Sequence, residues 1–259
     1  MPRQHQGISR EVNREAKPHG VARVISKRGF CSRSIAENLV REGRVSLRGK
    51  IVLDPDTPAF ENDEIAVDGK LIEAAQKFYF AMNKPRGIVT TANDEKGRKT
   101  VMDLFREQYA KMFPGRPVPH ISPVGRLDAA SEGLLLFTND TQWADALLAP
   151  RDPSFHLKIY RVQVAGKPSA AELKQMEDGF NVPPRVFGES EEFMHAERAV
   201  LHSVGEKNCW LEITLSEGKN REIRRMLAHL GYEVMRLMRI QFDKYTLGDL
   251  KSGEIREIN

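Results

Sequence analysis

The sequence predicts a protein of mixed helices and strands in two parts, a small N-terminal domain and a larger C-terminal one. The apolar residues Val21, Val24 and Ile25 have the spacing of one helical face, and a second helical segment follows them. Beyond residue 77, short apolar segments bounded by Gly, Pro, Asn and Asp alternate with segments of helical spacing. The 259 residues are enough for one large domain together with a small one.

The first part is predicted to be a pair of helices followed by a small sheet. Arg28-Gly29 ends the first helix, because glycine readily adopts the left-handed conformation found at helix C-termini. Ser32 suits the N-cap of the second helix, and Gly43 follows as its C-terminal stop. The apolar stripe of this second helix is expected to consist of Ile35, Leu39 and Val40. Extended segments are expected at residues 44–47, 51–53 and 64–67.

Positive charge is concentrated at the N-terminal end of the chain. Residues 1–50 contain 12 Lys and Arg against 4 Asp and Glu, a net charge of +8, so the remainder carries −4 within a total of +4. This asymmetry indicates an anionic partner, while a solvated basic tail is the common alternative. Residues 1–17 lack apolar periodicity and are predicted to form a flexible basic tail. The basic residues expected to contact phosphate in the following domain are Arg23, Lys27, Arg28, Arg33 and Arg44.

The second part is predicted to be built from strands interleaved with short helices. Strands are expected at residues 78–83, 88–90, 134–138, 157–164, 195–202, 208–215, 234–242 and 255–258. Helices are expected at residues 100–105, 143–148 and 168–176, and a further one after Asn220. The apolar stripe of that last helix is Ile223, Met226, Leu227 and Leu230. Residues 185–193 are predicted to form an acidic loop.

Two motifs place polar residues beside these elements. Asp128 closes the segment Gly125-Arg126-Leu127-Asp128, on a turn just before the apolar strand at 134–138. A core strand can hold such a side chain rigidly while it points into a cleft, although from spacing alone an aspartate that caps the turn is the more ordinary explanation. In the second motif, Arg221, Arg224 and Arg225 have the spacing of one helix face and give it a positive edge.

Several classes of protein are disfavoured by the composition. No apolar run is long enough to span a membrane, and the first residues lack the apolar core of a secretory signal. Cys31 and Cys209 lie far apart, and neither belongs to a CxxC pair. The histidines His195, His202 and His229 have no metal-ligand spacing, so neither a disulfide framework nor a metal site is expected. Two reduced thiols fit a cytoplasmic protein.

The motifs resemble two known families. Residues 21–67 resemble the alpha-L RNA-binding module of ribosomal protein S-four, through the segments Ser26–Arg33, Gly43-Arg44-Val45 and Asp63-Glu64-Ile65. Three later segments resemble the motifs of the pseudouridine synthases: Gly125–Asp128 with Gly133–Leu136, Lys158-Ile159-Tyr160, and Glu217–Met226. In this order, behind an alpha-L module, they are similar to the bacterial ribosomal-RNA branch. The chain departs from that branch at Ser131, where threonine is usual, and at Thr141, where glycine is usual.

The resemblance implies an α+β fold in which an RNA-binding domain at residues 18–74 precedes a catalytic domain at 78–259, built on a mixed, mostly antiparallel sheet. It implies an isomerase that converts a specific uridine in ribosomal RNA to pseudouridine with no cofactor and no metal. The implied partner is ribosomal RNA or a ribosomal subunit precursor, and the protein is expected to be a cytoplasmic monomer without membrane association. Gly133–Thr138 looks more like the large-subunit enzymes, and small-subunit RNA is the alternative.

The resemblance also assigns roles to individual residues. It makes Asp128 the catalytic carboxylate, as nucleophile or stabiliser of a sugar cation, or as the group that removes a sugar proton. Tyr160 would stack on the uracil and assist the final proton transfer, and Arg126 would fill the space left by a flipped uridine. Arg224 would hold Asp128 ionised, with Arg225 or Lys219 as alternatives. The residues expected to touch RNA around the cleft are Lys84, Arg86, Lys219, Arg221 and Arg225.

Two other functions remain open at this point. A non-catalytic, ribosome-associated RNA-binding factor would also explain the basic N-terminal block. A hydrolase using an unrelated carboxylate is less well supported, because no second carboxylate or histidine is placed as an acid–base partner for Asp128.

Overall fold

The computed structural model describes residues 18–73, 76–91, 94, 97–149, 156–184 and 190–258. The chain forms two compact units that divide between Gln76 and Lys77. The basic tail predicted at residues 1–17 and the part of the predicted acidic loop at 185–189 lie outside the described residues.

The N-terminal unit has the predicted pair of helices, α1 (Val21–Lys27) and α2 (Arg33–Arg41). The Ser32 side chain caps α2 by accepting a hydrogen bond from the amide of Ile35 at 3.3 Å, which confirms the predicted helix start. An antiparallel sheet follows in the order β3 (Lys50–Val52), β2 (Val45–Leu47), β5 (Ile65–Val67) and β6 (Lys70–Leu71). A separate pair joins β1 (His19–Gly20) to β4 (Pro58–Ala59).

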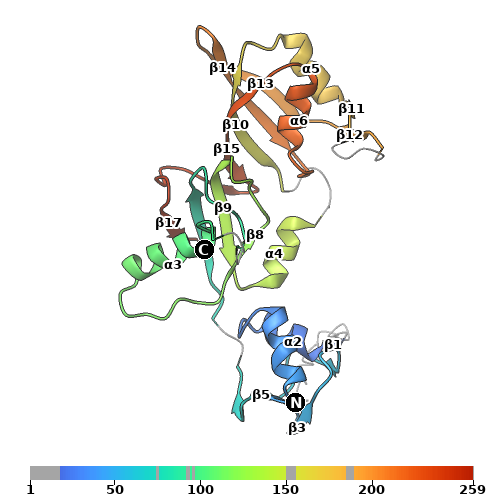
Figure 1. Cartoon of the computed structure of the whole chain (residues 1–259), viewed down its shortest axis with the longest axis vertical. Helices are drawn as coiled ribbons and strands as arrows, with labels where there is room; N and C mark the ends of the chain where they lie inside the picture. Colours follow the sequence, from blue (N-terminus) through green and yellow to red (C-terminus); the bar gives the residue numbers. More distant parts are fainter. Residues whose placement is uncertain are drawn as a thin grey trace, which may run out of the picture. The chain divides into compact units, whose positions relative to one another are not determined.

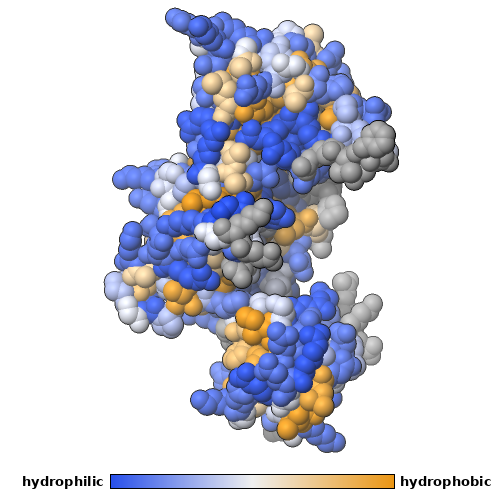
Figure 2. Space-filling view, in the orientation of Figure 1, coloured by the Kyte–Doolittle hydropathy of each residue, from blue (hydrophilic) through white to orange (hydrophobic). Residues whose placement is uncertain are grey.

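The predicted apolar stripe of α2 is wrong at one position. Ile35 is 50% exposed, whereas Ala36, Leu39 and Val40 are buried against α1 and the sheet. The small side chain of Ala36 lets α1 approach closely, so the buried face is centred there and Ile35 is turned outward. Figure 2 shows apolar patches on this unit among hydrophilic residues, in keeping with its exposed large hydrophobic side chains.

The C-terminal unit is built on one long sheet with the order β13-β14-β10-β15-β9-β7-β17, and β8 and β16 attach to β9 and β15. Neighbouring strands are antiparallel except for β15 and β9, which pair in parallel through two residue pairs. The sheet is therefore mixed and mostly antiparallel, as predicted. The strands are β7 (Tyr79–Lys84), β8 (Ser122–Val124), β9 (Glu132–Thr138), β10 (Lys158–Ala165), β13 (Arg198–Val204), β14 (Asn208–Leu215), β15 (Val234–Phe242), β16 (Tyr245–Thr246) and β17 (Ile255–Glu257).

Strand alternation divides the core of this unit between the two faces of the sheet. Leu135 and Phe137 of β9 face one cluster, and Leu134 and Leu136 face the other. The larger cluster includes side chains of α3 (Val101–Met112), α5 (Ala170–Asp178) and α6 (Glu222–His229), and the smaller one includes Leu147 of α4 (Thr141–Leu148). Figure 1 shows α5 and α6 beside the β13–β15 part of the sheet and α3 beside β17.

Two predicted elements differ in the structure. Residues 88–90 are not a strand, and Val89 forms only an isolated bridge to Thr100. The helix predicted at 100–105 begins as expected, where Thr100 forms a capping box with Asp103. It extends to Met112 because its buried apolar stripe continues through Tyr109. A short pair, β11 (Phe180–Val182) and β12 (Glu192–Met194), includes the end of the predicted acidic loop. Within the residues that the structure describes, no helix is long and apolar enough to cross a membrane.

Candidate active site

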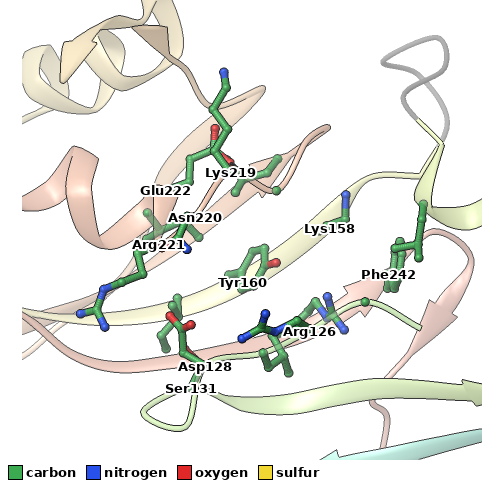
Figure 3. Close-up of a pocket in the computed structure, with 18 of the residues that line it drawn as sticks. Arg126, Asp128, Ser131, Lys158, Tyr160, Lys219, Asn220, Arg221, Glu222 and Phe242 are labelled. Atoms are coloured by element: carbon green, nitrogen blue, oxygen red, sulfur yellow. Dashed lines mark hydrogen bonds between the residues drawn. The ribbon is translucent and has the colours of Figure 1, made fainter. Parts of the chain in front are cut away.

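A pocket opens in the C-terminal unit where four segments meet. They are the loop before β9, the start of β10, the turn that leads into α6, and β15. Figure 3 shows Asp128 and Arg126 near Tyr160, with Lys158 and Phe242 farther along on the opposite side of Tyr160 from Asp128. The polar and aromatic residues that line the pocket include Arg126, Asp128, Lys158, Tyr160, Arg221, Glu222, Arg239 and Phe242.

The turn that carries Asp128 is held by its main-chain carbonyls. The buried ammonium of Lys84 donates to the carbonyls of Asp128 and Ser131, at 3.1 and 2.7 Å. The hydroxyl of Thr90 donates to Leu127 O at 2.6 Å, and Gly87 N donates to Ala129 O at 2.7 Å. With the contact of Ala130 described below, every carbonyl from residue 127 to 131 accepts a hydrogen bond, which fixes the position of the turn.

The side chain of Asp128 is exposed to the pocket, unlike its main chain. Among the described residues, no hydrogen bond or ion pair reaches its carboxylate. This arrangement disfavours the alternative in which Asp128 caps its own turn, because a capping carboxylate would accept a nearby amide. The carboxylate is therefore rigidly placed and available to a ligand.

Arg224 supports the turn in a way that the sequence did not predict. Its guanidinium donates to Ala130 O at 3.2 Å and to Val234 O at 3.1 Å, so it joins the Asp128 turn to the start of β15. Burial lowers the pKa of Arg224, and the charge of Asp128 acts in the opposite direction, which places the two charges within electrostatic reach. Arg224 forms no direct ion pair with Asp128 in the described part of the chain.

The two alternatives to Arg224 are occupied elsewhere. Arg225 pairs with Glu192 at 2.5 Å and is largely buried, and Lys219 bonds to Glu217 and to Phe193 O. Of the three basic residues considered as partners of Asp128, Arg224 is therefore the one whose contacts lie at the Asp128 turn.

Tyr160 and Arg126 lie in the pocket with Asp128. Tyr160 is buried in β10, and this burial raises the pKa of its phenol while the charge of Arg239 opposes the rise. Arg126 lies two residues before Asp128, is exposed and lines the same pocket. The fold thus brings these three residues to one pocket, as the family resemblance implies.

Three residues that line the pocket were not predicted as site residues. Arg239 is buried on β15, and Lys158 begins β10. Glu222, the first residue of α6, is buried, and this burial raises the pKa of its carboxyl to about 7. Lys158 and Glu222 lie within two of the motifs that carry the family resemblance, which was the available signal, whereas the place of Arg239 depends on how β10 and β15 pair.

The structure does not support an RNA contact for two residues predicted to make one beside the cleft. Lys84 is fully buried, its ammonium bonds to carbonyls, and its pKa falls to about 8 because of burial. The side chain of Arg225 is only 13% exposed and is paired with Glu192. Arg86 and Arg221 are exposed, so their side chains remain accessible, and that of Lys219 is partly exposed.

In the N-terminal unit, most of the predicted RNA-contacting side chains pair with acids or carbonyls. Arg28 donates to Ile72 O at 2.7 Å and to Glu61 O at 3.0 Å, so it holds the fold of the unit together. Lys27 pairs with Glu61 at 2.6 Å, Arg33 with Glu37 at 3.1 Å and Arg44 with Asp68 at 2.7 Å. Arg23, Arg33 and Arg44 are exposed. Exposed pairs are weak, so phosphate can compete for these side chains.

No group of three or more His, Cys, Asp or Glu residues in the described ranges is arranged to hold a metal ion. The chemistry that the pocket itself offers is that of one free carboxylate, one buried phenol and several cations.

A small unit with exposed arginines, followed by an α+β unit whose pocket holds a free carboxylate and several cations, fits an enzyme that acts on a polyanion such as RNA. Comparison with known families makes this specific: residues 78–229 match the RNA pseudouridylate synthase family, and residues 21–65 match the S4 domain. The chain belongs to the RNA pseudouridine synthases and carries an S4 domain at its N-terminal side.

Individual relatives agree with this assignment. The chain is 35% identical over 239 residues to the ribosomal large subunit pseudouridine synthase B of Bacillus subtilis (strain 168), covering 91% of this chain and 90% of that one. It is 36% identical over 250 residues to an uncharacterized RNA pseudouridine synthase of Rickettsia conorii, covering 93% and 96%. A crystal structure of a pseudouridylate synthase matches with a TM-score of 0.60 at 26% identity, covering 93% and 96%.

Proposed function

We propose that this enzyme converts a uridine of large-subunit ribosomal RNA to pseudouridine, with Asp128 as the catalytic carboxylate. The observation that carries the proposal for Asp128 is its turn, in which the main chain is bonded throughout while the carboxylate is left free in the pocket. A rigid, unpaired carboxylate suits attack on a sugar carbon or stabilisation of a sugar cation.

The remaining roles follow from the positions of the neighbouring side chains. Tyr160 offers a ring against which the uracil stacks beside Asp128. Arg126 is exposed at the pocket and takes the place of the uridine that leaves its stack. Arg224 binds the Asp128 turn at Ala130 O and favours the ionised carboxylate through its charge.

The proposed substrate rests on the Bacillus subtilis relative, whose name specifies the large ribosomal subunit. In this proposal, residues 18–74 bind ribosomal RNA or a precursor particle and residues 78–259 perform the isomerisation. The enzyme is proposed to act as a cytoplasmic monomer. Small-subunit RNA is the alternative substrate, and mapping pseudouridines in both RNAs from cells with and without the gene distinguishes the two.

The catalytic role of Asp128 is tested with Asp128→Asn, which keeps the shape of the side chain and removes its charge. Pseudouridine formation in ribosomal RNA transcripts is expected to be abolished, while the dissociation constant for the RNA stays within about twofold, because phosphate contacts dominate affinity. Asp145→Asn, an exposed aspartate on α4, serves as the matched control and should retain full activity. If Asp128→Asn loses RNA binding together with activity, Asp128 is a structural residue and the assignment is wrong.

A further inference from the structure

Arg239 is a buried cation in the wall of the pocket. Its side chain is only 3% exposed, and its Nε donates to Leu134 O at 2.8 Å. Its Nη2 is buried and has no hydrogen-bond partner. Among the described residues, no carboxylate lies close enough to form an ion pair with it. A buried guanidinium without an acid is costly to fold, so its place in a pocket indicates a use for the charge.

A second cation, Lys158, lies close to Arg239. The ammonium of Lys158 is 5.3 Å from the centre of the Phe242 ring, and the guanidinium carbon of Arg239 is 4.9 Å from it. Burial and the charge of Arg239 both lower the pKa of Lys158. The ammonium of Lys158 also lies 3.4 Å from Glu217 O and 3.5 Å from Ser216 O, and among the described residues it forms no ion pair with a carboxylate.

The buried acid in the pocket wall offers little compensation for these charges. Glu222 is buried, and a carboxyl with a pKa of about 7 is only partly ionised at neutral pH. Its Oε2 accepts the amide of Lys219 at 3.0 Å, which turns it toward the loop before α6. This wall of the pocket is therefore positively charged and would attract a negatively charged group of a ligand.

The isomerisation itself creates such a group. When the bond from C1′ to N1 breaks, the electron pair remains with the uracil, and the negative charge spreads from N1 to the carbonyl oxygens O2 and O4. The ring then turns, C5 bonds to C1′, the C5 proton leaves, and N1 gains a proton. From the cleavage of the C1′–N1 bond until C5 bonds to C1′, the free base is an anion.

The geometry places this anion beside the two cations. Asp128 lies on one side of Tyr160, and Lys158 and Phe242 lie on the other (Figure 3). A nucleotide with its sugar at Asp128 and its base on Tyr160 extends toward Lys158 and Arg239. We propose that Arg239, assisted by Lys158, binds a carbonyl oxygen of the uracil and stabilises the negative charge that develops on the base as the glycosidic bond breaks.

This proposal rests on the proposed function, and the experiment separates the two. Single-turnover rates and RNA dissociation constants are measured for Arg239→Gln and Lys158→Met, with thermal unfolding as a check on folding. Arg161→Gln is the control, because Arg161 is a partly buried arginine on β10 that pairs with Glu212 outside the pocket. Absence of pseudouridine formation by the unaltered enzyme would disprove the proposed function itself.

The expected result is a rate reduced by about 10²-fold in Arg239→Gln, as for loss of one preorganised donor to a developing anion. A smaller loss is expected in Lys158→Met, and the RNA dissociation constant should change little in either variant. If the main effect is weaker RNA binding, the cations hold a phosphate and the proposal is overturned. If Arg239→Gln does not fold, Lys158→Met decides the question, and an unchanged rate there refutes the proposal.

A second substrate distinguishes charge stabilisation from a packing role. In RNA with 5-fluorouridine at the target, fluorine makes the uracil a better leaving group, so cleavage depends less on an added cation. Because C5 of 5-fluorouridine carries no proton to lose, its reaction ends at a C5-linked adduct that keeps the fluorine. Consumption of 5-fluorouridine, followed by chromatography and mass spectrometry of nucleoside digests, should fall less in Arg239→Gln than consumption of uridine does. An equal fall for both substrates assigns Arg239 a merely structural role.

Discussion

Gly133 occupies the closest contact between β9 and β15, and replacing it with alanine tests how the pocket is assembled. A Cβ at this position would lie 2.3 Å from Arg239 O and 2.8 Å from Arg239 N. Both atoms belong to the backbone, so no side chain can move aside. Gly133 also has a φ of +101°, which residues with a side chain rarely adopt. The added methyl group must therefore push β15 away from β9.

The loss in free energy of unfolding follows from these two contributions, the close contact and the positive φ. Overpacking a closely packed contact costs about 1–3 kcal/mol, and the positive φ adds roughly 1 kcal/mol. For a unit of this size, about 3 kcal/mol corresponds to a fall in Tm of roughly 6–12 °C. Catalytic activity should also fall at temperatures where the variant is still folded, since the displaced contact joins Arg239 to the strand that follows the Asp128 turn.

Thermal unfolding followed by circular dichroism, with a parallel activity assay, measures both effects. Gly115→Ala is the control, because Gly115 has a similar φ of +77° but no atom within 4 Å of an added Cβ. Its Tm should fall by only roughly 2–4 °C. Equal losses in the two variants would show that the backbone angle alone matters, and the argument from the β9–β15 contact would be refuted.

Two further variants test buried groups near the pocket. Glu222 has a pKa raised from 4.5 to about 7, so between these values the folded protein binds more protons than the unfolded chain, and its free energy of unfolding should decrease as pH rises. Denaturant titrations should give a flatter pH profile for Glu222→Gln, and an unchanged profile would contradict this origin. Lys84→Met leaves the buried carbonyls of Asp128 and Ser131 with fewer donors and should cost about 3 kcal/mol together with at least tenfold in activity. Urea unfolding and single-turnover assays measure these losses, and native activity in Lys84→Met would show that the turn holds its position without the ammonium.

The sequence predicted most of the elements because their local signals agree with their packing. The Ser32 cap and the apolar spacing of α6 are both found in the structure. The grouping of Arg126, Asp128 and Tyr160 was predicted through the family resemblance, since the strand pairing that brings them together has no local signal. Residues 88–90 looked like a strand by composition, but beyond one bridge they have no partner strand.

The contacts of the basic residues were the least predictable feature. Lys84 resembled a turn residue, but it is the last residue of β7 and points into the protein. Besides the carbonyl of Pro85, its partners are the carbonyls of Asp128 and Ser131, more than 40 positions later, so no short-range pattern reveals them. Arg28 likewise bonds to carbonyls more than 30 positions away. A basic side chain in a sequence indicates charge, whereas its partner depends on the tertiary fold.

Arg239 was missed for a different reason. In the segment from Val234 to Phe242 it looks like one of several polar residues along a strand. A register shift in the pairing of β10 with β15, between Ile159 and Tyr160, places Arg239 opposite Tyr160. Such a bulge turns a side chain toward a site, and the neighbouring sequence does not predict where the bulge occurs.

The parallel pairing of β9 with β15 also affects the order in which the two units of the protein are completed during synthesis. Asp128 precedes β9, whereas Arg224 and Arg239 follow it by about a hundred residues. The N-terminal unit has its own apolar core and its helices and strands are complete by Leu71. Because domains fold as they emerge from the ribosome, the nascent chain presents its S4 domain long before β15 joins the sheet. The S4 domain is therefore expected to fold before the pocket is complete, and a chain that stops before Val234 would lack the strand that carries Arg239.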